Sequence, residues 1–276
     1  MIQYASDNGK TESTAWLLDF KNRTADLAAE RKRAEKKAER ELNADPNSLS
    51  EIKKVWKFEK QESSDSTSAQ GRQQSNPGGT VIVTGYKGDS TDVIVPEKIC
   101  GDTVTAIGKY AFSPNAERLR KEQRALREAI TKVTLPDTIE SIGEFAFCKC
   151  KSLTEINFPK KLTKISKGMF EYTGFENIVI EGHIKRIGSA AFYVCRALKH
   201  VKLCEGVAEI GSGAFYNCTE LETIELPRSL ERVPSNVMPN APFWKCHKLT
   251  ALVHKGSYAE TYCKENNIAY KYKDEE

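Results

Sequence analysis

The middle of the chain repeats one pattern of apolar and polar residues. Residues 187–195 read IGSAAFYVC, and residues 210–218, which lie 23 positions later, read IGSGAFYNC. The same frame extends from about Val93 to Leu252, and its fullest form is L-x-x-I-x-L-P-x-x-L-x-x-I-G-x-x-A-F-x-x-C. A fixed period of this size is typical of a solenoid, in which each repeat buries its apolar face against its neighbours.

Each repeat contains signals for short extended elements joined by turns. The I-x-L step alternates as a strand with one buried face does, and the proline that often follows cannot continue a strand ladder. Glycine follows the next apolar position at 108, 143, 188 and 211, where we expect a tight bend. Two repeats are longer than the others, by about 12 and 5 residues. A phenylalanine marks the corner of each repeat, at Phe112, Phe147, Phe170, Phe192, Phe215 and Phe243.

This signature resembles the BspA-like bacterial leucine-rich repeat family. The resemblance covers roughly residues 80–263, with 83–108 similar to the family's first repeat and 253–263 similar to its C-terminal cap. It implies a right-handed leucine-rich-repeat solenoid of about six turns, a β/α or β/3-10 superhelix with short parallel strands. Single turns depart from the signature at Thr173 (corner cysteine), Glu181 and Cys204 (proline) and Val233-Pro234 (Ile-Gly).

The two ends of the chain do not fit the repeat. Residues 1–54 predict a charged helical segment, which is either a solvated helix or a docking helix for a partner. Alternating runs at 55–60 and 80–86 predict a capping hairpin within 55–92, with a mobile polar loop at 61–79. The solenoid then covers 93–252, and residues 253–276 form a C-terminal cap and tail.

Composition and charge narrow the class of protein. A net charge of +4 on 276 residues is too small to favour a nucleic-acid partner. No run of 18 apolar residues predicts a membrane span, and residues 1–10 lack the pattern of a signal peptide. We therefore expect a cytoplasmic protein. The alternative is a secreted or cell-surface protein if the sequence is a fragment, because the family that it resembles contains many such proteins.

Four of the eight cysteines share one position in the repeat, three residues after the phenylalanine. Residues at one position stack about 4.7–4.9 Å apart along a solenoid, where buried thiols pack as small apolar groups and donate to backbone carbonyls. A disulfide or a zinc site is the alternative, although Cys148 and Cys150 lack the second pair that zinc requires. We expect a structural cysteine ladder and no cofactor. Its members are Cys150, Cys195, Cys218 and Cys246.

An insertion at 113–129 interrupts the stack and predicts an amphipathic helix, with Pro114 in its first turn. Insertions in repeat proteins map to loops on one face, which is sometimes the binding face. The alternative is a lengthened corner with a solvated side. The side chains that could meet an anionic partner are Arg118, Arg120, Lys121, Arg124 and Arg127.

A second candidate surface follows from strand alternation, since residues between the buried positions should face outward. Stacked side by side, these residues form a strip of mixed charge without the aromatic or arginine anchors that are usual in protein interfaces. The strip consists of Lys132, Thr134, Glu155, Asn157, Asn177, Val179, His200, Lys202, Thr223 and Glu225.

No catalytic constellation is apparent. The four histidines fall in different repeats without a nucleophile or ligand at matching register, and no phosphate-binding glycine loop precedes a helix. We therefore predict a non-catalytic protein–protein interaction module with a protein partner. One alternative is an adhesin-like surface protein that binds host or matrix proteins, as the resemblance implies. Another is a structural repeat region in which the N-terminal helices carry the specific role.

Overall fold

A computed structural model describes residues 48–61 and 79–273. The helices expected within 1–47 and nearly all of the polar loop expected at 61–79 lie outside these residues. The chain divides into two compact units, and the second begins at Leu49. Helix α2 (Ser48–Val55) therefore belongs almost entirely to the unit that contains the repeats, whereas the sequence analysis assigned it to the N-terminal segment.

The N-terminal end of the solenoid is a small mixed sheet. Strand β1 (Trp56–Gln61) pairs antiparallel with β2 (Thr80–Tyr86), and β2 pairs in parallel with β5 (Asp102–Ile107). Strand β4 (Lys98–Ile99) pairs antiparallel with β5. The apolar residues of β2 and β5 alternate and are buried. The sheet thus covers an apolar core and a strand edge that a first coil would otherwise expose.

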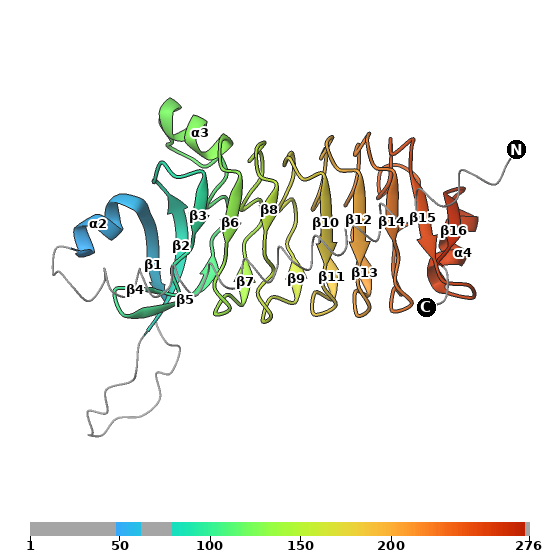
Figure 1. Cartoon of the computed structure of the whole chain (residues 1–276), viewed down its shortest axis with the longest axis horizontal. Coiled ribbons are helices and arrows are strands. Elements are labelled where there is room, and N and C mark those ends of the chain that lie inside the picture. The colour runs from blue at the N-terminus through green and yellow to red at the C-terminus, as the bar shows by residue number, and fades with distance from the viewer. Residues whose placement is uncertain (1–47, 62–78, 274–276) are drawn as a thin grey trace, which may run out of the picture. The chain divides into compact units, whose positions relative to one another are not determined.

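Short parallel strands form a first column along the solenoid, where they lie side by side (Figure 1). The pairing joins residues one repeat apart, as in Val201 with Ile224. One sheet contains β3 (Asp92–Ile94), β6 (Lys132–Thr134) and β8 (Glu155–Ile156). The next contains β10 (Asn177–Ile180), β12 (His200–Leu203), β14 (Thr223–Glu225), β15 (Thr250–Val253) and β16 (Ala269–Tyr272).

A second column of two-residue strands follows the first within each coil. It contains β7 (Ser141–Ile142), which pairs with β5, and the three-stranded sheet of β9 (Lys164–Ile165), β11 (Arg186–Ile187) and β13 (Glu209–Ile210). The predicted solenoid with short parallel strands is confirmed. It has about eight turns, two more than the six expected, because the segments before and after the recognisable repeats continue the strand columns.

The repeat phenylalanines form one buried column, as the period predicts. Neighbouring ring centroids are 4.9 Å apart for Phe112 and Phe147, 5.4 Å for Phe170 and Phe192 and 5.3 Å for Phe192 and Phe215, and each of these pairs is stacked. Successive coils therefore rest directly on one another through these rings. Tyr86 and Trp56 pack on Phe112 at one end, and Tyr262 of helix α4 (Tyr258–Glu265) packs on Phe243 at the other.

The corners at Phe147, Phe170, Phe192 and Phe215 turn sharply because the residues two positions before and after each phenylalanine adopt left-handed backbone angles. Around Phe192 these are Ala190, with φ of 54°, and Val194, with φ of 57°. Neither is a glycine, and a β-branched residue such as Val194 is rarely found in this region. The stacked coils hold this conformation, since the N–H of Val194 donates to the carbonyl of Tyr216 in the next coil at 2.8 Å.

The glycines at 108, 143, 188 and 211 serve another purpose than the predicted bend. None of them has a positive φ. Instead, each lies against the preceding coil: the N–H of Gly188 donates to the carbonyl of Ile165 at 2.8 Å, and a Cβ at Gly188 would lie 2.7 Å from that oxygen. The prediction of a tight bend was therefore wrong, and glycine is required here because two backbones approach closely.

The predicted cysteine ladder is present, and its thiols donate to backbone carbonyls. The Sγ atoms of Cys195, Cys218 and Cys246 lie 3.0, 3.2 and 3.1 Å from the carbonyl oxygens of the phenylalanines one coil earlier. Burial raises the pKa of Cys195 to about 11, so this thiol stays protonated at neutral pH. All eight cysteines are free thiols in the structure.

Ion pairs on the surface follow the coil spacing as well. Eight pairs among the described residues join a lysine or arginine to a carboxylate in an adjacent coil, including both coils with insertions. Each surface pair contributes little alone, but together they show that ion pairs between neighbouring coils recur along the solenoid. The pairs are Lys109–Glu144, Lys132–Glu155, Lys151–Glu128, Lys161–Glu140, Arg186–Glu209, Lys199–Glu176, Lys202–Glu225 and Lys248–Glu220.

Candidate protein-binding surface

The predicted strip lies on the outer side of the first strand column. Along β12, the half-buried His200 and Lys202 alternate with the buried Val201 and Leu203, and β14 repeats this alternation. The register places His200 beside Thr223 and Lys202 beside Glu225. Strand alternation therefore brings these residues into two neighbouring rows.

Two of the ten strip residues are buried and were wrongly expected to face a partner. Thr134 and Val179 each have only 7% of their surface exposed. In a parallel stack, the side chains of the adjacent strands flank an outward-facing residue on both sides. Thr134 pairs with the larger Ile94, and Val179 pairs with Lys202, whose long aliphatic stem can cover an apolar neighbour.

Much of the remaining strip is engaged in contacts between coils. The carboxamide of Asn157 accepts a hydrogen bond from the N–H of Leu135 at 2.7 Å and donates to its carbonyl at 2.8 Å. Lys132 and Glu155 form an ion pair at 3.9 Å. The imidazole Nδ1 of His200 and the hydroxyl of Thr223 are 2.8 Å apart. These side chains hold neighbouring coils in register rather than projecting freely.

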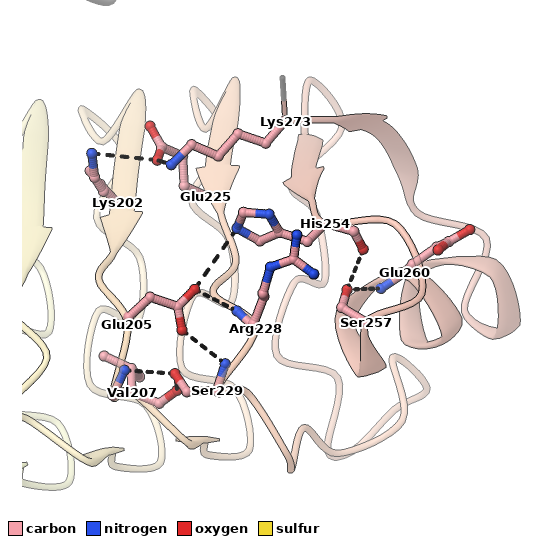
Figure 2. A network of polar contacts seen from close by, with 11 residues as sticks. Lys202, Glu205, Val207, Glu225, Arg228, Ser229, His254, Ser257, Glu260 and Lys273 are labelled. Carbon is pink, nitrogen blue, oxygen red and sulfur yellow. Dashed lines mark hydrogen bonds and ion pairs between the residues drawn. The ribbon is translucent and has the colours of Figure 1, made fainter. Parts of the chain in front are cut away.

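The C-terminal part of the strip forms a denser polar network (Figure 2). Glu225 lies between two cations, 3.7 Å from Lys202 and 3.3 Å from Lys273. At the turn below them, the carboxylate of Glu205 accepts hydrogen bonds from the N–H groups of Arg228 and Ser229 at 2.8 and 3.1 Å. Burial opposes ionisation of Glu205, but these hydrogen bonds outweigh it and lower its pKa. The network stabilises the turns of adjacent coils.

The insertion at 113–129 contains a shorter helix than predicted. Helix α3 spans Lys121–Glu128, and Pro114 lies well before its first turn. Arg127 was expected to meet a partner, but it is buried: its guanidinium donates to the carbonyls of Tyr86 and Ser113 at distances between 2.8 and 3.2 Å. Burial lowers the pKa of Arg127 to about 10. Arg127 fastens the insertion to the solenoid, and the basic side chains that stay exposed are Arg118, Arg120, Lys121 and Arg124.

The corners of the later coils carry an aromatic surface that the sequence analysis did not identify. Tyr193, Tyr216 and Trp244 each follow a phenylalanine of the buried column directly. The rings of Tyr193 and Tyr216 are stacked with centroids 4.9 Å apart, and Trp244 is 39% exposed. The recurrence of an aromatic residue after the phenylalanine is a signal in the sequence that could have revealed this surface.

A loop without charged side chains adjoins this row, since the N–H of Phe215 donates to the carbonyl of Pro242 within the loop. Residues 233–244 contain no charged side chain, and Val237 and Met238 within them are 64% and 47% exposed. Two hydrogen bonds hold this loop in place. The side chain of Asn236 accepts from the N–H of Phe243, and the backbone N–H of Asn236 donates to the side chain of Asn266. We define the corner surface as Tyr193, Tyr216, Val237, Met238 and Trp244.

Comparison with known proteins identifies the repeats. A profile described as a BspA type leucine rich repeat region matches residues 126–250 with six copies. Residues 126–250 therefore resemble BspA-type leucine-rich repeats. Comparison with curated proteins gives no match.

Two crystal structures of bacterial proteins resemble this solenoid. A T. pallidum leucine-rich repeat protein, TpLRR, is 28% identical over 63% of this chain and 74% of its own, with a TM-score of 0.53. The pneumococcal vaccine antigen PcpA is 26% identical over 67% of this chain and 47% of its own, also with a TM-score of 0.53. This chain therefore spans less than half of the PcpA structure.

The histidines and other possible metal ligands of this solenoid lie apart from one another. Within residues 48–61 and 79–273, no three His, Cys, Asp or Glu side chains are grouped so that they could hold a metal ion. His200, His183 and His254 contact Thr223, Glu181 and Glu205, respectively, each in a different part of the stack. In the described part of the chain, no helix has the length and apolar content needed to cross a bilayer.

Proposed function

We propose that this chain is a non-catalytic protein-interaction module, in which the solenoid presents the corner surface to a protein partner. The observation that carries this proposal is the exposure of Trp244. The same corner surface contains the stacked rings of Tyr193 and Tyr216 and the loop without charged side chains. Tryptophan, tyrosine and methionine are enriched in protein interfaces. The rigid backbone beneath them reduces the entropy lost on binding.

The corner surface is a better anchor than the strip. The charged residues of the strip already have partners in adjacent coils, so a protein partner would have to compete with these contacts. In the corner surface, Val237, Met238 and Trp244 have exposed apolar side chains. We propose that the accessible residues of the strip and the insertion act as a polar rim: Glu155, Asn177, His200, Lys202, Thr223 and Glu225, with Arg118, Arg120, Lys121 and Arg124.

Substitution of Trp244 by alanine tests this proposal. We expect proteins captured from a lysate of the source organism to bind the Trp244→Ala variant about 30-fold more weakly, because truncation of an interface tryptophan commonly costs 2 kcal/mol or more. The measurement is quantitative mass spectrometry of proteins retained by immobilised protein over a range of concentrations. The thermal unfolding midpoint is measured as well, to show that the variant is folded at the temperature of capture, because part of Trp244 packs against the protein.

Ile94→Ala is the matched control, since Ile94 is an apolar side chain with 42% exposure outside the corner surface. This variant should retain partners as the wild type does. Equal retention by the Trp244→Ala variant, or capture of nothing by the wild type, would contradict the proposal.

A role at the cell surface is a second candidate. It is favoured by the similarity to PcpA, which is a vaccine antigen, and antigens of this use are reached by antibodies. The corner surface would then contact a host or matrix protein, as in the adhesin alternative. The same Trp244→Ala comparison applies, with host proteins in place of the lysate.

A further inference from the structure

One coil of the solenoid carries three exposed lysines that lie close together in the sequence. The ammonium groups of Lys160, Lys164 and Lys167 form no hydrogen bond or ion pair with any residue that the structure describes. All three side chains are exposed, and they belong to the coil that contains strand β9. Other exposed lysines on the solenoid, such as Lys151, Lys161 and Lys248, each have a carboxylate one coil away.

The neighbouring coil adds positive charge rather than compensating for it. In the sheet of β9 and β11, Lys164 pairs directly with Arg186, so two cations lie side by side on the outer face. Lys185 is exposed beside Arg186, and its ammonium group donates to a backbone carbonyl, that of Gly182. Like charges in directly paired positions destabilise a sheet. We name Lys160, Lys164, Lys167, Lys185 and Arg186 the basic face.

The carboxylates around the basic face are already engaged. Glu140 pairs with Lys161 at 2.8 Å, and Glu144 pairs with Lys109 at 3.2 Å. On the far side of Arg186, Glu209 accepts from its guanidinium at 2.7 Å. Glu209 therefore offsets the charge of Arg186, but no carboxylate in the described part of the chain pairs with Lys160, Lys164 or Lys167.

We propose that the basic face docks an acidic segment of a protein partner. An extended segment with Asp or Glu on one side would lay its carboxylates across β9 and β11, where cations from neighbouring coils lie one strand spacing apart. This inference rests on the proposed function and names the chemistry of one partner. It concerns a different face from the corner surface, so each can fail without the other.

A protein segment fits this face better than a nucleic acid does. Four of the five cations are lysines, which act as compact point charges, and the single arginine already has a carboxylate partner. Recognition of phosphate usually employs free arginines with their planar donors. Single strands of nucleic acid also need aromatic side chains on which bases stack, and β9, β11 and β13 contain none.

The test compares two triple variants of the full chain with the same change in net charge. K160A/K164A/K167A removes the unmatched lysines of the basic face. K98A/K255A/K271A removes three exposed lysines from other places on the surface. Binding of fluorescein-labelled poly-L-glutamate is measured by anisotropy at low and physiological ionic strength, with heparin and single-stranded DNA as competing probes.

We expect the basic-face variant to bind poly-L-glutamate about tenfold more weakly than the wild type. This is the loss in affinity expected when three exposed ion pairs with the probe are removed. The control variant should stay within about twofold, and salt should weaken wild-type binding. Equal weakening by the two variants would overturn the proposal, because net charge alone would then explain binding. Preferential binding of heparin or DNA over poly-L-glutamate would overturn it too. In either case, capture that depends on Trp244 would leave the proposed function intact.

Discussion

Replacement of Phe192 by alanine is expected to lower the free energy of unfolding by about 4 kcal/mol, the usual cost of truncating a fully buried phenylalanine. Phe192 is 0% exposed, and its ring stacks on Phe170 and Phe215 in the adjacent coils. The cavity cannot close easily, because hydrogen bonds to both neighbouring coils fix the corner backbone. Urea denaturation of wild type and variant, monitored by circular dichroism, measures the loss.

Phe192→Leu provides the comparison, since it removes the ring but keeps most of the apolar volume. This variant should lose clearly less stability than Phe192→Ala. A loss below about 1 kcal/mol for the alanine variant is what an exposed side chain would give, and it would contradict burial of this ring.

Replacement of Gly188 by alanine is expected to destabilise the protein by about 3 kcal/mol, because the added Cβ overpacks a site without space. That atom would lie 2.7 Å from the carbonyl oxygen of Ile165 and 2.9 Å from the backbone nitrogen of Lys167. Neither backbone can move without breaking the hydrogen bond between Gly188 and Ile165. Thermal and urea denaturation measure the effect, and Ser189→Ala, which adds no atom, is the control.

Gly188→Asn distinguishes close approach from a bend. Asparagine tolerates left-handed backbone angles better than alanine does. If the bend required glycine, Gly188→Asn would therefore lose less stability than Gly188→Ala. Close packing predicts the opposite order, since asparagine is larger. Greater stability of Gly188→Asn than of Gly188→Ala would restore the bend interpretation.

The period of the sequence was sufficient to predict the parts of the fold that repeat. Phe147 and Phe170 occupy equivalent positions, so a solenoid stacks them, and the same reasoning places Cys195 beside Cys218. The number of turns was underestimated because strands such as β2 and β16 join the stack without the signature. Position within a repeat therefore predicts which residues share a column, provided that the repeat is recognisable.

The candidate surfaces were harder to predict, because side chains outside the repeating core depend on individual neighbours. Val179 is buried by its surroundings although its strand position faces outward. Arg127 looks like any cation of a solvated helix, but the insertion folds back so that it reaches the carbonyl of Tyr86. The period gives no information on such contacts, which depend on where a non-repeating segment packs. Trp244 lies at a corner outside the strands, so strand alternation gives no information on its exposure.

The most direct test of the stacked-coil architecture is a pair of double-mutant cycles with phenylalanine-to-leucine substitutions. Direct contact between Phe192 and Phe215 predicts a coupling free energy of about 1 kcal/mol, as measured for aromatic pairs. Phe112 and Phe215, which are separated by three intervening phenylalanines of the column, should show coupling within the error of about 0.4 kcal/mol. The absence of coupling between Phe192 and Phe215, or equal coupling in both cycles, would contradict the architecture.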